Sequence, residues 1–335
     1  MDVDYLIIGD GISGLLLLQR ILSDKRGSVL LISPTKSARS LRYSNSQTYW
    51  CQGILHRGYK YSLEGHARPE LDRYADRFVA DLSGIVDFSS FVLSDHVKIL
   101  ADSASHFPNT VKTSSGHYFG DRVKVGIFPE QVIDSWSLAK TLRLQLHKSI
   151  HAAELQSIEH KCGVISKISL SSDRVIKPKH VFMCAGHKNA SIWHNMMSMP
   201  VPVIQQVRPV VVGEMQHSNI FDLHAHILFN KKWALTINSL KNVAGDSTWR
   251  LGGPLFDSSV SLSCIKEETY KIISHFFGIH SPSMTLRVTG RAEKNADGAR
   301  VLRPRRFKAG NVTIGWPVKM VMAPVLVDKM LRDIS

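Results

Sequence analysis

The stretch that decides the fold lies at residues 4–33 and reads DYLIIGDGISGLLLLQRILSDKRGSVLLIS. Residues 4–9 are an apolar run typical of a buried strand, and residues 13–24 have the density of Leu and Ile expected of a packed helix. Residues 28–33 form a second apolar run. Strand, helix and strand in this order predict a βαβ unit at the start of the chain.

The turn between the first strand and the helix is rich in glycine. It reads Gly9-Asp10-Gly11-Ile12-Ser13-Gly14 and fits the pattern G-x-G-x-x-G. In that pattern the first glycine makes a tight turn, the second lets a pyrophosphate approach the backbone, and the third lets helix and strand pack closely. The amides at the helix N-terminus then bind the anion. The turn therefore predicts a dinucleotide site.

The end of the second strand departs from this fingerprint. Ser33 stands where an acidic residue is expected to accept the ribose hydroxyls, and a serine can accept only one of them. Lys36 and Arg39 follow, and basic residues at this place can accept a 2′-phosphate. The fingerprint alone thus leaves both FAD and NADP open.

Composition excludes several classes of protein. The 335 residues are 44% apolar and 21% charged, which is ordinary for a globular protein and excludes a disordered chain, a collagen and a disulfide scaffold. Lys and Arg outnumber Asp and Glu by 42 to 28, and the net charge of +14 favours anionic partners. The four Cys have no C-x-x-C spacing, so we expect free thiols and no metal site.

We expect a cytoplasmic protein. The acidic start runs into a strand pattern without the segments of a signal peptide, and no apolar run reaches the ~18 residues of a spanning helix. The basic cluster at residues 300–308 is interpreted as a solvated loop, which leaves a peripheral contact with the inner face of the membrane open. With one aromatic residue it offers little for base stacking, so nucleic acid is not favoured as a partner.

Three further segments distinguish between the dinucleotides. The first joins Ser46-Gln47 to residues 52–61, QGILHRGYKY. The second, FMCAG at residues 182–186, is typical of a strand that ends at a glycine. The third, GNVTIGWPVKMVMAP at residues 310–324, predicts a strand, a glycine turn and the start of a helix.

With these segments the chain resembles, from end to end, the FAD-dependent oxidoreductases of the D-amino-acid oxidase type, such as glycine oxidase and sarcosine oxidase. The first segment is similar to the family stretch that passes beside the flavin ring. The second resembles the strand that returns to the dinucleotide, and the third resembles the C-terminal flavin patch. Patterns such as Gln206-Val207-Arg208-Pro209 and Trp316-Pro317-Val318-Lys319 are most similar to a poorly characterised bacterial subgroup.

The resemblance implies an α/β fold with a Rossmann-like FAD-binding domain of the glutathione-reductase type and an interleaved antiparallel β-rich substrate domain. We expect residues 1–80, 135–195 and 285–335 in the FAD-binding domain, and residues 81–134 and 196–284 in the substrate domain. FAD is the implied cofactor. The implied cofactor-binding residues are Gly9, Gly11, Ile12, Ser13, Gly14, Ser33, Ser46, Gln47, Gly53, Ile54, Val164, Ala185, Gly186, Gly315, Trp316, Pro317, Val318 and Lys319.

The family oxidises a C–H bond of a small amine, amino acid or 2-hydroxy acid by hydride transfer to flavin N5, and the resemblance implies the same reaction here. Lys319 is the candidate for stabilising negative charge on the reduced flavin. His56 is a candidate substrate contact, base or covalent flavin link, and Tyr59 a candidate pocket residue. An anionic substrate would favour a bidentate arginine, for which Arg250 is the first candidate, followed by Arg208 and Arg291.

Other functions stay open at this point. Ser33, Lys36 and Arg39 leave room for an NADP-dependent Rossmann oxidoreductase. The positive charge leaves room for an FAD domain that acts on a modified tRNA base. The unusual Ser33 also allows a flavoprotein without turnover. The sequence does not choose the substrate, the electron acceptor or the oligomeric state.

Overall fold

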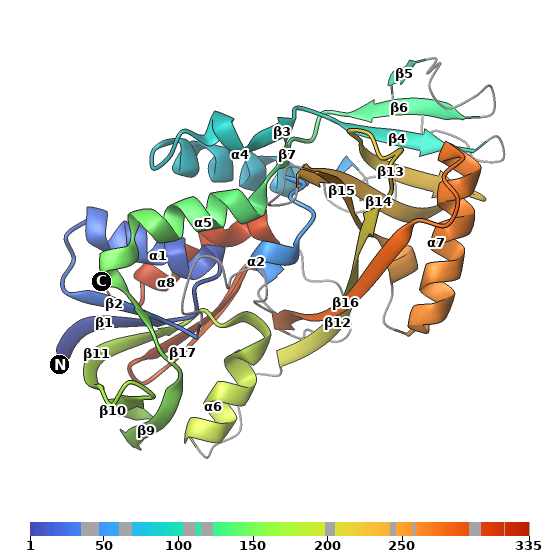
Figure 1. Cartoon of the computed structure of the whole chain (residues 1–335). Helices are drawn as coiled ribbons and strands as arrows, with labels where there is room; N and C mark the ends of the chain where they lie inside the picture. Colours follow the sequence, from blue (N-terminus) through green and yellow to red (C-terminus); the bar gives the residue numbers. More distant parts are fainter. Residues whose placement is uncertain are drawn as a thin grey trace.

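Two sheets of eight strands each organise the chain in the computed structural model (Figure 1). The structure describes residues 1–34, 47–59, 69–102, 112–114, 123–197, 205–241, 246–256, 259–294, 303–317 and 319–334. In Figure 1 the first sheet lies at the left with helices α1, α5 and α8, and the second lies at the right beside α7.

The first sheet has the order β17-β18-β11-β1-β2-β8, and β9 and β10 extend from β11. Its strands are β1 (Asp2–Ile8), β2 (Val29–Ser33), β8 (Ile150–Ala152), β9 (Leu155–Lys161), β10 (Val164–Leu170), β11 (Val175–Met183), β17 (Arg305–Ala309) and β18 (Val312–Trp316). β1 runs parallel to β2 and β11, and β11 runs parallel to β18. The predicted βαβ unit is confirmed, because α1 (Ile12–Ser23) connects β1 to β2. The carboxyl ends of β1, β11 and β18 therefore share one edge.

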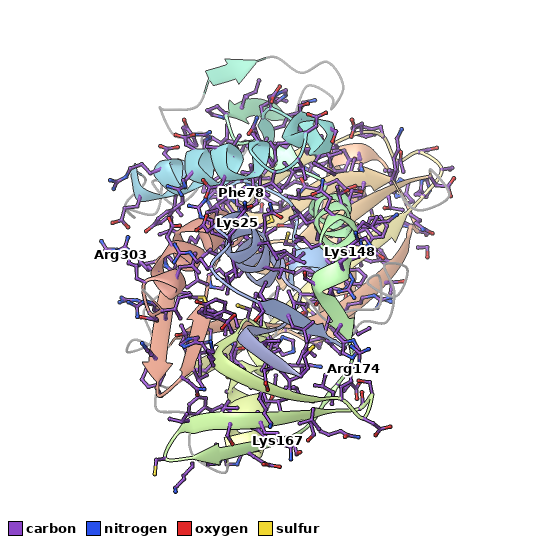
Figure 2. The ribbon with its side chains drawn as sticks, turned by 90° about the vertical axis from the view of Figure 1, so that its left-hand side faces the viewer. Lys25, Phe78, Lys148, Lys167, Arg174 and Arg303 are labelled. Carbon is purple, nitrogen blue, oxygen red and sulfur yellow. The ribbon has the colours of Figure 1, made fainter. Side chains whose placement is uncertain are left out.

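Helices cover one face of this sheet. They are α1, α4 (Pro69–Ser83), α5 (Ser135–Gln145) and α8 (Ala323–Leu331), and one apolar core joins them to β1, β2 and β11. Leu15 and Leu17 of α1 are completely buried, as is Phe78, which Figure 2 shows on the inner side of α4. These side chains explain why the Leu-rich run of α1 packs as a helix against the sheet.

A second core covers the opposite face. It includes Trp193 of α6 (Asn189–Met197) and apolar residues of β9, β10 and β18. At the far side, Figure 2 places Lys167 and Arg174 on the outer surface of the β9–β11 region. Helices, parallel sheet and an outer layer thus form three layers around two apolar cores, as expected for a Rossmann-like unit.

The second sheet has the order β16-β12-β15-β14-β13-β4-β6-β5. Its strands are β4 (Val97–Ala101), β5 (Lys112–Ser114), β6 (Lys124–Phe128), β12 (Gln205–Gln216), β13 (His224–Phe229), β14 (Lys232–Lys241), β15 (Ser247–Gly252) and β16 (Ser283–Lys294). Its pairs are antiparallel except β13 with β4. α7 (Leu262–Phe277) packs Ile265, Ile272 and Phe276 into the core of this sheet.

The remaining elements are short and lie between the longer helices and strands. They are α2 (Gln47–Trp50), β3 (Val92–Ser94), β7 (Val132–Ile133) and the 3-10 turns η2 (Phe88–Phe91), η3 (His147–Ser149), η4 (Gly186–Lys188), η5 (Pro254–Phe256) and η6 (Met320–Met322). The expected division of the chain differs from the packing at two places. Leu82, Phe88 and Phe91 fall in the expected substrate domain but belong to the apolar core of the first sheet. β16 pairs with β12 along its whole length, so residues 285–294 belong to the second sheet, not to the FAD-binding part.

Candidate active site

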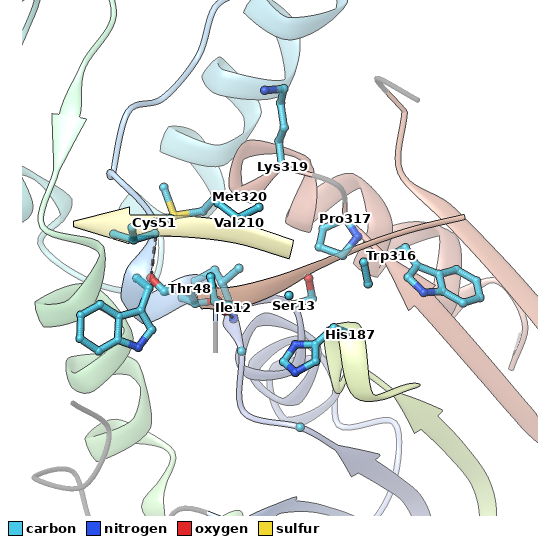
Figure 3. A pocket seen from close by; sticks show the side chains of 18 of the residues that line it. Ile12, Ser13, Thr48, Cys51, His187, Val210, Trp316, Pro317, Lys319 and Met320 are labelled. Carbon is cyan, nitrogen blue, oxygen red and sulfur yellow. Dashed lines mark hydrogen bonds between the residues drawn. The ribbon is translucent and has the colours of Figure 1, made fainter. Parts of the chain in front are cut away.

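A cavity of about 710 Å³ is lined by residues from both sheets. Cofactor and ligand sites typically occupy about 300–1,000 Å³. The lining comes from segments far apart in the sequence: residues 9–13, 34, 48, 50–54, 56, 184–188, 210–212, 252–253, 289–290, 292, 315–317 and 319–321. Figure 3 shows Ser13, His187, Trp316 and Pro317 on one side of this cavity, and Thr48, Cys51 and Met320 on the other.

The glycine turn forms one end of the cavity. A Cβ on Gly9, whose φ is +110°, would lie 2.7 Å from the Cys184 carbonyl oxygen, so β1 and the end of β11 approach closely only because residue 9 is glycine. A Cβ on Gly14 would lie 2.0 Å from the carbonyl oxygen of Gly9. The hydroxyl of Ser13 is buried and has no hydrogen-bond partner among the described residues, although Ser13 lines the cavity.

Ser33 does not line the cavity. It is completely buried at the end of β2, and its hydroxyl donates to Asp10 Oδ2 at 2.8 Å. Arg143 of α5 donates to the same carboxylate oxygen and to Ser33 Oγ, the latter at 3.0 Å. An acidic group therefore does stand beside the end of β2, but it comes from the glycine turn.

The segment after α2 joins the glycine turn to the second sheet. Thr48 Oγ1 accepts a hydrogen bond from the Ile12 amide at 3.0 Å. Gln52 donates from Nε2 to the Thr236 carbonyl at 3.1 Å. Gly53, Ile54 and His56 follow and line the cavity, as do Cys51 and Gln52.

His56 lies beside a buried carboxylate. Its Nδ1 is 3.4 Å from Glu130 Oε2, and Glu130 Oε1 accepts from the Arg57 amide at 2.9 Å. Glu130 has no exposed surface. Burial raises the pKa of this carboxyl, but His56, the Arg57 amide and Lys319 outweigh burial and hold its pKa below the ordinary value. Glu130 is therefore an anion in the neutral pH range.

A second histidine completes this cluster. The His226 ring stacks on that of His56, with centroids 6.1 Å apart and an angle of 11° between planes. His226 Nδ1 lies 2.8 Å from Thr236 Oγ1. One ligand atom from each of His56, Glu130 and His226 lies within 4.8 Å of the others, so these three side chains could also hold a metal ion.

The segments at residues 184–188 and 315–317 form another part of the cavity lining, and the side chain of Asn189 hydrogen-bonds to both. Asn189 is completely buried, accepts from the Ala185 amide at 2.8 Å, and donates to the Gly315 carbonyl at 3.3 Å. Ala185, Gly186, Gly315, Trp316, Pro317 and Lys319 all line the cavity. Asn189 was not among the expected site residues, although its position three residues after Gly186, at the first residue of α6, was a usable signal.

Arg250 occupies another place than the one expected. It does not line the cavity, and its Nη1 donates to the carbonyls of Tyr49 and Cys51 at 3.0 and 3.1 Å. Its guanidinium also lies 5.4 Å from the Trp50 ring centroid and 3.6 Å from Glu214. Burial lowers the pKa of Arg250, and Glu214 opposes that effect. Because these contacts occupy a buried side chain, the structure gives it a structural role at the end of α2 in place of substrate binding.

Other expected site residues lie elsewhere or outside the described part. Tyr59 does not line the cavity and stacks on Phe128, with centroids 5.5 Å apart. Val164 is 46% exposed at the start of β10, away from the cavity lining. The residues that lie wholly or in their side chains outside the described part are Lys36, Arg39, Ser46, Gln47, Arg208, Arg291 and Val318.

The charged groups along the described lining are few. Lys188, Lys319, His56 and His187 are its basic residues, and Asp10 is its acidic residue. Burial lowers the pKa of His187, and Lys188 adds to the effect. His56 and Lys319 both act on the buried Glu130 carboxylate, so this end of the cavity carries charge of both signs.

Comparison with known proteins finds flavoproteins that are similar to this chain. No family model matches it. It is 25% identical to a probable FAD-dependent oxidoreductase of Pseudomonas aeruginosa, over 98% of this chain and 90% of that protein. The crystal structure of an FAD-dependent oxidoreductase from Pseudomonas aeruginosa matches with a TM-score of 0.78 at 19% identity, over 100% of this chain and 90% of that one.

Two further solved structures have the same fold. Iminodiacetate oxidase from Chelativorans matches with a TM-score of 0.66 at 15% identity, over 97% of this chain and 93% of that one. L-α-glycerophosphate oxidase from Mycoplasma pneumoniae, solved with FAD bound, matches with a TM-score of 0.65 at 14% identity, over 99% and 94%. The resemblance to FAD-dependent oxidoreductases and the expected fold class are confirmed. Among the described helices none is long and apolar enough to cross a membrane.

Proposed function

We propose that this chain is an FAD-dependent oxidoreductase that oxidises a small amine, amino acid or 2-hydroxy acid. The observation that carries the proposal is the single cavity that joins the glycine turn to the His56–Glu130 pair and to the C-terminal segment at residues 315–321. A nucleotide site and a proton-accepting group thus share one cavity. The sequence similarity to a probable FAD-dependent oxidoreductase supports this reading over the full length.

The glycine turn fits the pyrophosphate of FAD. The Gly9 and Gly14 positions leave no room for a Cβ beside the carbonyls of Cys184 and Gly9, which is the tight turn and close helix–strand packing of a pyrophosphate-binding turn. The unpartnered Ser13 hydroxyl and the N-terminus of the 12-residue α1 supply donors and positive potential for an anion. Ala185, Gly186 and the segment at 315–317 would hold the rest of the cofactor.

His56 is suited to take the proton that the substrate hydroxyl or amine loses. FAD, when bound, supplies the acceptor for the hydride from the substrate carbon. Glu130 faces Nδ1 of His56, which favours a proton on that nitrogen and leaves Nε2 to accept the substrate proton. The buried anion then stabilises the imidazolium that forms. Lys319, on the same lining, supplies positive charge for the reduced cofactor or for the carboxylate of a substrate.

Anaerobic reduction of the FAD-loaded protein tests this proposal. We expect members of a panel of amines, amino acids and 2-hydroxy acids to bleach the flavin absorbance of the wild type. His56→Gln should slow this reduction by about 100- to 10,000-fold, the range for loss of a positioned base. The matched control is His194→Gln, an exposed histidine of α6, which should reduce at the wild-type rate.

Glu130→Gln separates a positioning role from a structural one. It should slow reduction by at least ~10-fold and move the acidic limb of the pH–rate profile to lower pH, because the anion that favours protonated His56 is gone. Wild-type protein treated with EDTA should reduce its flavin at the same rate as untreated wild-type protein. A loss of activity that Zn²⁺ restores would assign His56, Glu130 and His226 to a metal site instead. Bound FAD that no compound of these classes reduces would contradict the proposed reaction.

A further inference from the structure

We propose that Asp10, at the variable second position of the glycine turn, binds the adenosine ribose of FAD in place of the acidic residue that β2 lacks. The inference rests on the proposed FAD site and adds a binding residue to it. A carboxylate at the end of β2 ordinarily accepts the ribose hydroxyls. β2 ends at Ser33 instead, and the Ser33 hydroxyl donates to Asp10 Oδ2 at 2.8 Å. The carboxylate of Asp10 therefore stands within one hydrogen bond of the expected place.

The surroundings of Asp10 hold its carboxylate in one orientation. Ser33 and Arg143 both donate to Oδ2, and Arg143 also donates to Ser33 Oγ at 3.0 Å. Asp10, Ser33 and Arg143 are 6%, 0% and 7% exposed, so the three groups form a buried cluster. Such a pair is retained in a fold only with close geometry, because both charges give up their water.

The second carboxylate oxygen is left for a ligand. Every hydrogen bond described for Asp10 goes to Oδ2, and Asp10 lines the cavity while Ser33 and Arg143 do not. Oδ1 is an acceptor without hydrogens, so it suits a hydroxyl donor. Ser33 and Arg143 are positioning residues in this arrangement, and Asp10 is the group that touches the cofactor.

The cluster also bears on the choice of dinucleotide. A 2′-phosphate would meet the negative charge of Asp10, whereas a free ribose would donate hydroxyl protons to it. The cation of the cluster, Arg143, is buried behind Asp10 and already engaged by it. The site thus favours an unphosphorylated ribose, which agrees with FAD and opposes the NADP alternative.

Binding of two flavins to the FAD-free protein tests the inference. FMN carries the flavin and one phosphate but no adenosine, so it probes the cavity without the ribose contact. We expect Asp10→Asn to weaken FAD binding by about 10- to 100-fold, the range for hydrogen bonds to a charged group, and to leave FMN binding unchanged. Asp173→Asn, an exposed position on the β10–β11 turn, should change neither.

A second variant keeps the test decisive if Asp10→Asn folds poorly with Arg143 left unpaired. The double variant Asp10→Asn/Arg143→Met removes both charges and should show the same selective loss of FAD binding. FAD binding equal to wild type in a folded variant, or equal losses for FAD and FMN, would overturn the inference. Tighter binding of adenosine 2′,5′-bisphosphate than of ADP by the wild type would also overturn it. A wild type that binds neither flavin would overturn the proposed function itself.

Discussion

The two ends of the cavity are built in different ways. The nucleotide end is centred on one continuous turn, Gly9–Gly14, whose shape depends on backbone atoms in close contact. The other end brings together His56, Glu130 and His226, which belong to three separate segments and act through side-chain charge and hydrogen bonding. The first end is specified by local spacing, and the second only by the complete fold.

This difference predicts how each end responds to change. At the nucleotide end, added atoms meet backbone that cannot move aside. At the histidine end, a change of side-chain chemistry alters the reaction and leaves the backbone in place. Substitutions at the nucleotide end should therefore reduce stability and FAD binding, whereas substitutions at the histidine end should mainly reduce the rate of flavin reduction.

Gly14→Ala should break the nucleotide end completely. Its Cβ would lie 2.0 Å from the carbonyl oxygen of Gly9, a backbone atom that cannot rotate away. We expect a loss of FAD binding and a fall in the free energy of unfolding of about 3 kcal/mol. The matched control is Gly84→Ala, where the nearest atom would be the Asp81 carbonyl oxygen at 3.5 Å, an ordinary contact. Equal stability of the two variants by thermal unfolding would contradict this account.

Much of the nucleotide end could be predicted from the sequence. The βαβ unit and the glycine turn follow from short patterns, and the family resemblance implied that residues 184–186 and 315–317 return to the same cavity. What could not be predicted is the role of Asp10, because it depends on α5 bringing Arg143 to the end of β2. The sequence shows that β2 ends at Ser33 without an acidic residue and that the turn contains Asp10. Only the folded structure shows that these two side chains lie within hydrogen-bond distance of each other.

Little of the histidine end could be predicted. His56 was named from its segment, yet Glu130 follows β6 in a Phe-Pro-Glu stretch with no recognisable pattern, and His226 lies on a strand of the second sheet. Arg250 was expected to bind substrate because of the strand on which it lies. Its side chain instead donates to the carbonyls of Tyr49 and Cys51 at the end of α2. Direction of a side chain depends on long-range packing, which short patterns do not contain.

Arg250→Met tests whether Arg250 stabilises the structure beside the cavity or binds the substrate. We expect the free energy of unfolding to fall by about 2–4 kcal/mol, because the buried carbonyls of Tyr49 and Cys51 lose a charged hydrogen-bond donor. The substrate concentration for half-maximal reduction should stay within ~2-fold of wild type in protein that folds. The control is Arg287→Met, since Arg287 also lies over Trp50, at 4.6 Å, but is exposed. A variant that keeps the wild-type stability but has a strongly raised KM would show that Arg250 binds the substrate.

His180→Gln is a smaller test, directed at the first sheet, whose strands β11 and β18 end at the cavity. Burial, with a contribution from Lys308, lowers the pKa of His180 to about 4, and its Nε2 lies 3.0 Å from Thr313 Oγ1. The unfolded chain takes up this proton below its ordinary pKa of about 6.5, whereas the folded chain does so only near 4. Stability of the wild type therefore falls as pH drops from about 6.5 to about 4.

The variant lacks this titrating group. Relative to His180→Gln, the wild type should lose roughly 2 kcal/mol between pH 7 and pH 4.5, measured by urea unfolding at each pH. His147→Gln, at an exposed position of η3, should follow the wild-type curve. Parallel curves for wild type and His180→Gln would show that His180 takes up its proton equally in both states.

The most direct test of the central claim is the visible absorbance spectrum of the purified protein, after incubation with FAD and removal of the excess. The account predicts flavin bands that stay with the protein and that pass to the supernatant as FAD on acid precipitation. Absence of flavin bands, with no uptake of added FAD by folded protein, would contradict the account. Colour that stays in the acid pellet would confirm the site with a covalent link, for which His56 and Cys51 line the cavity.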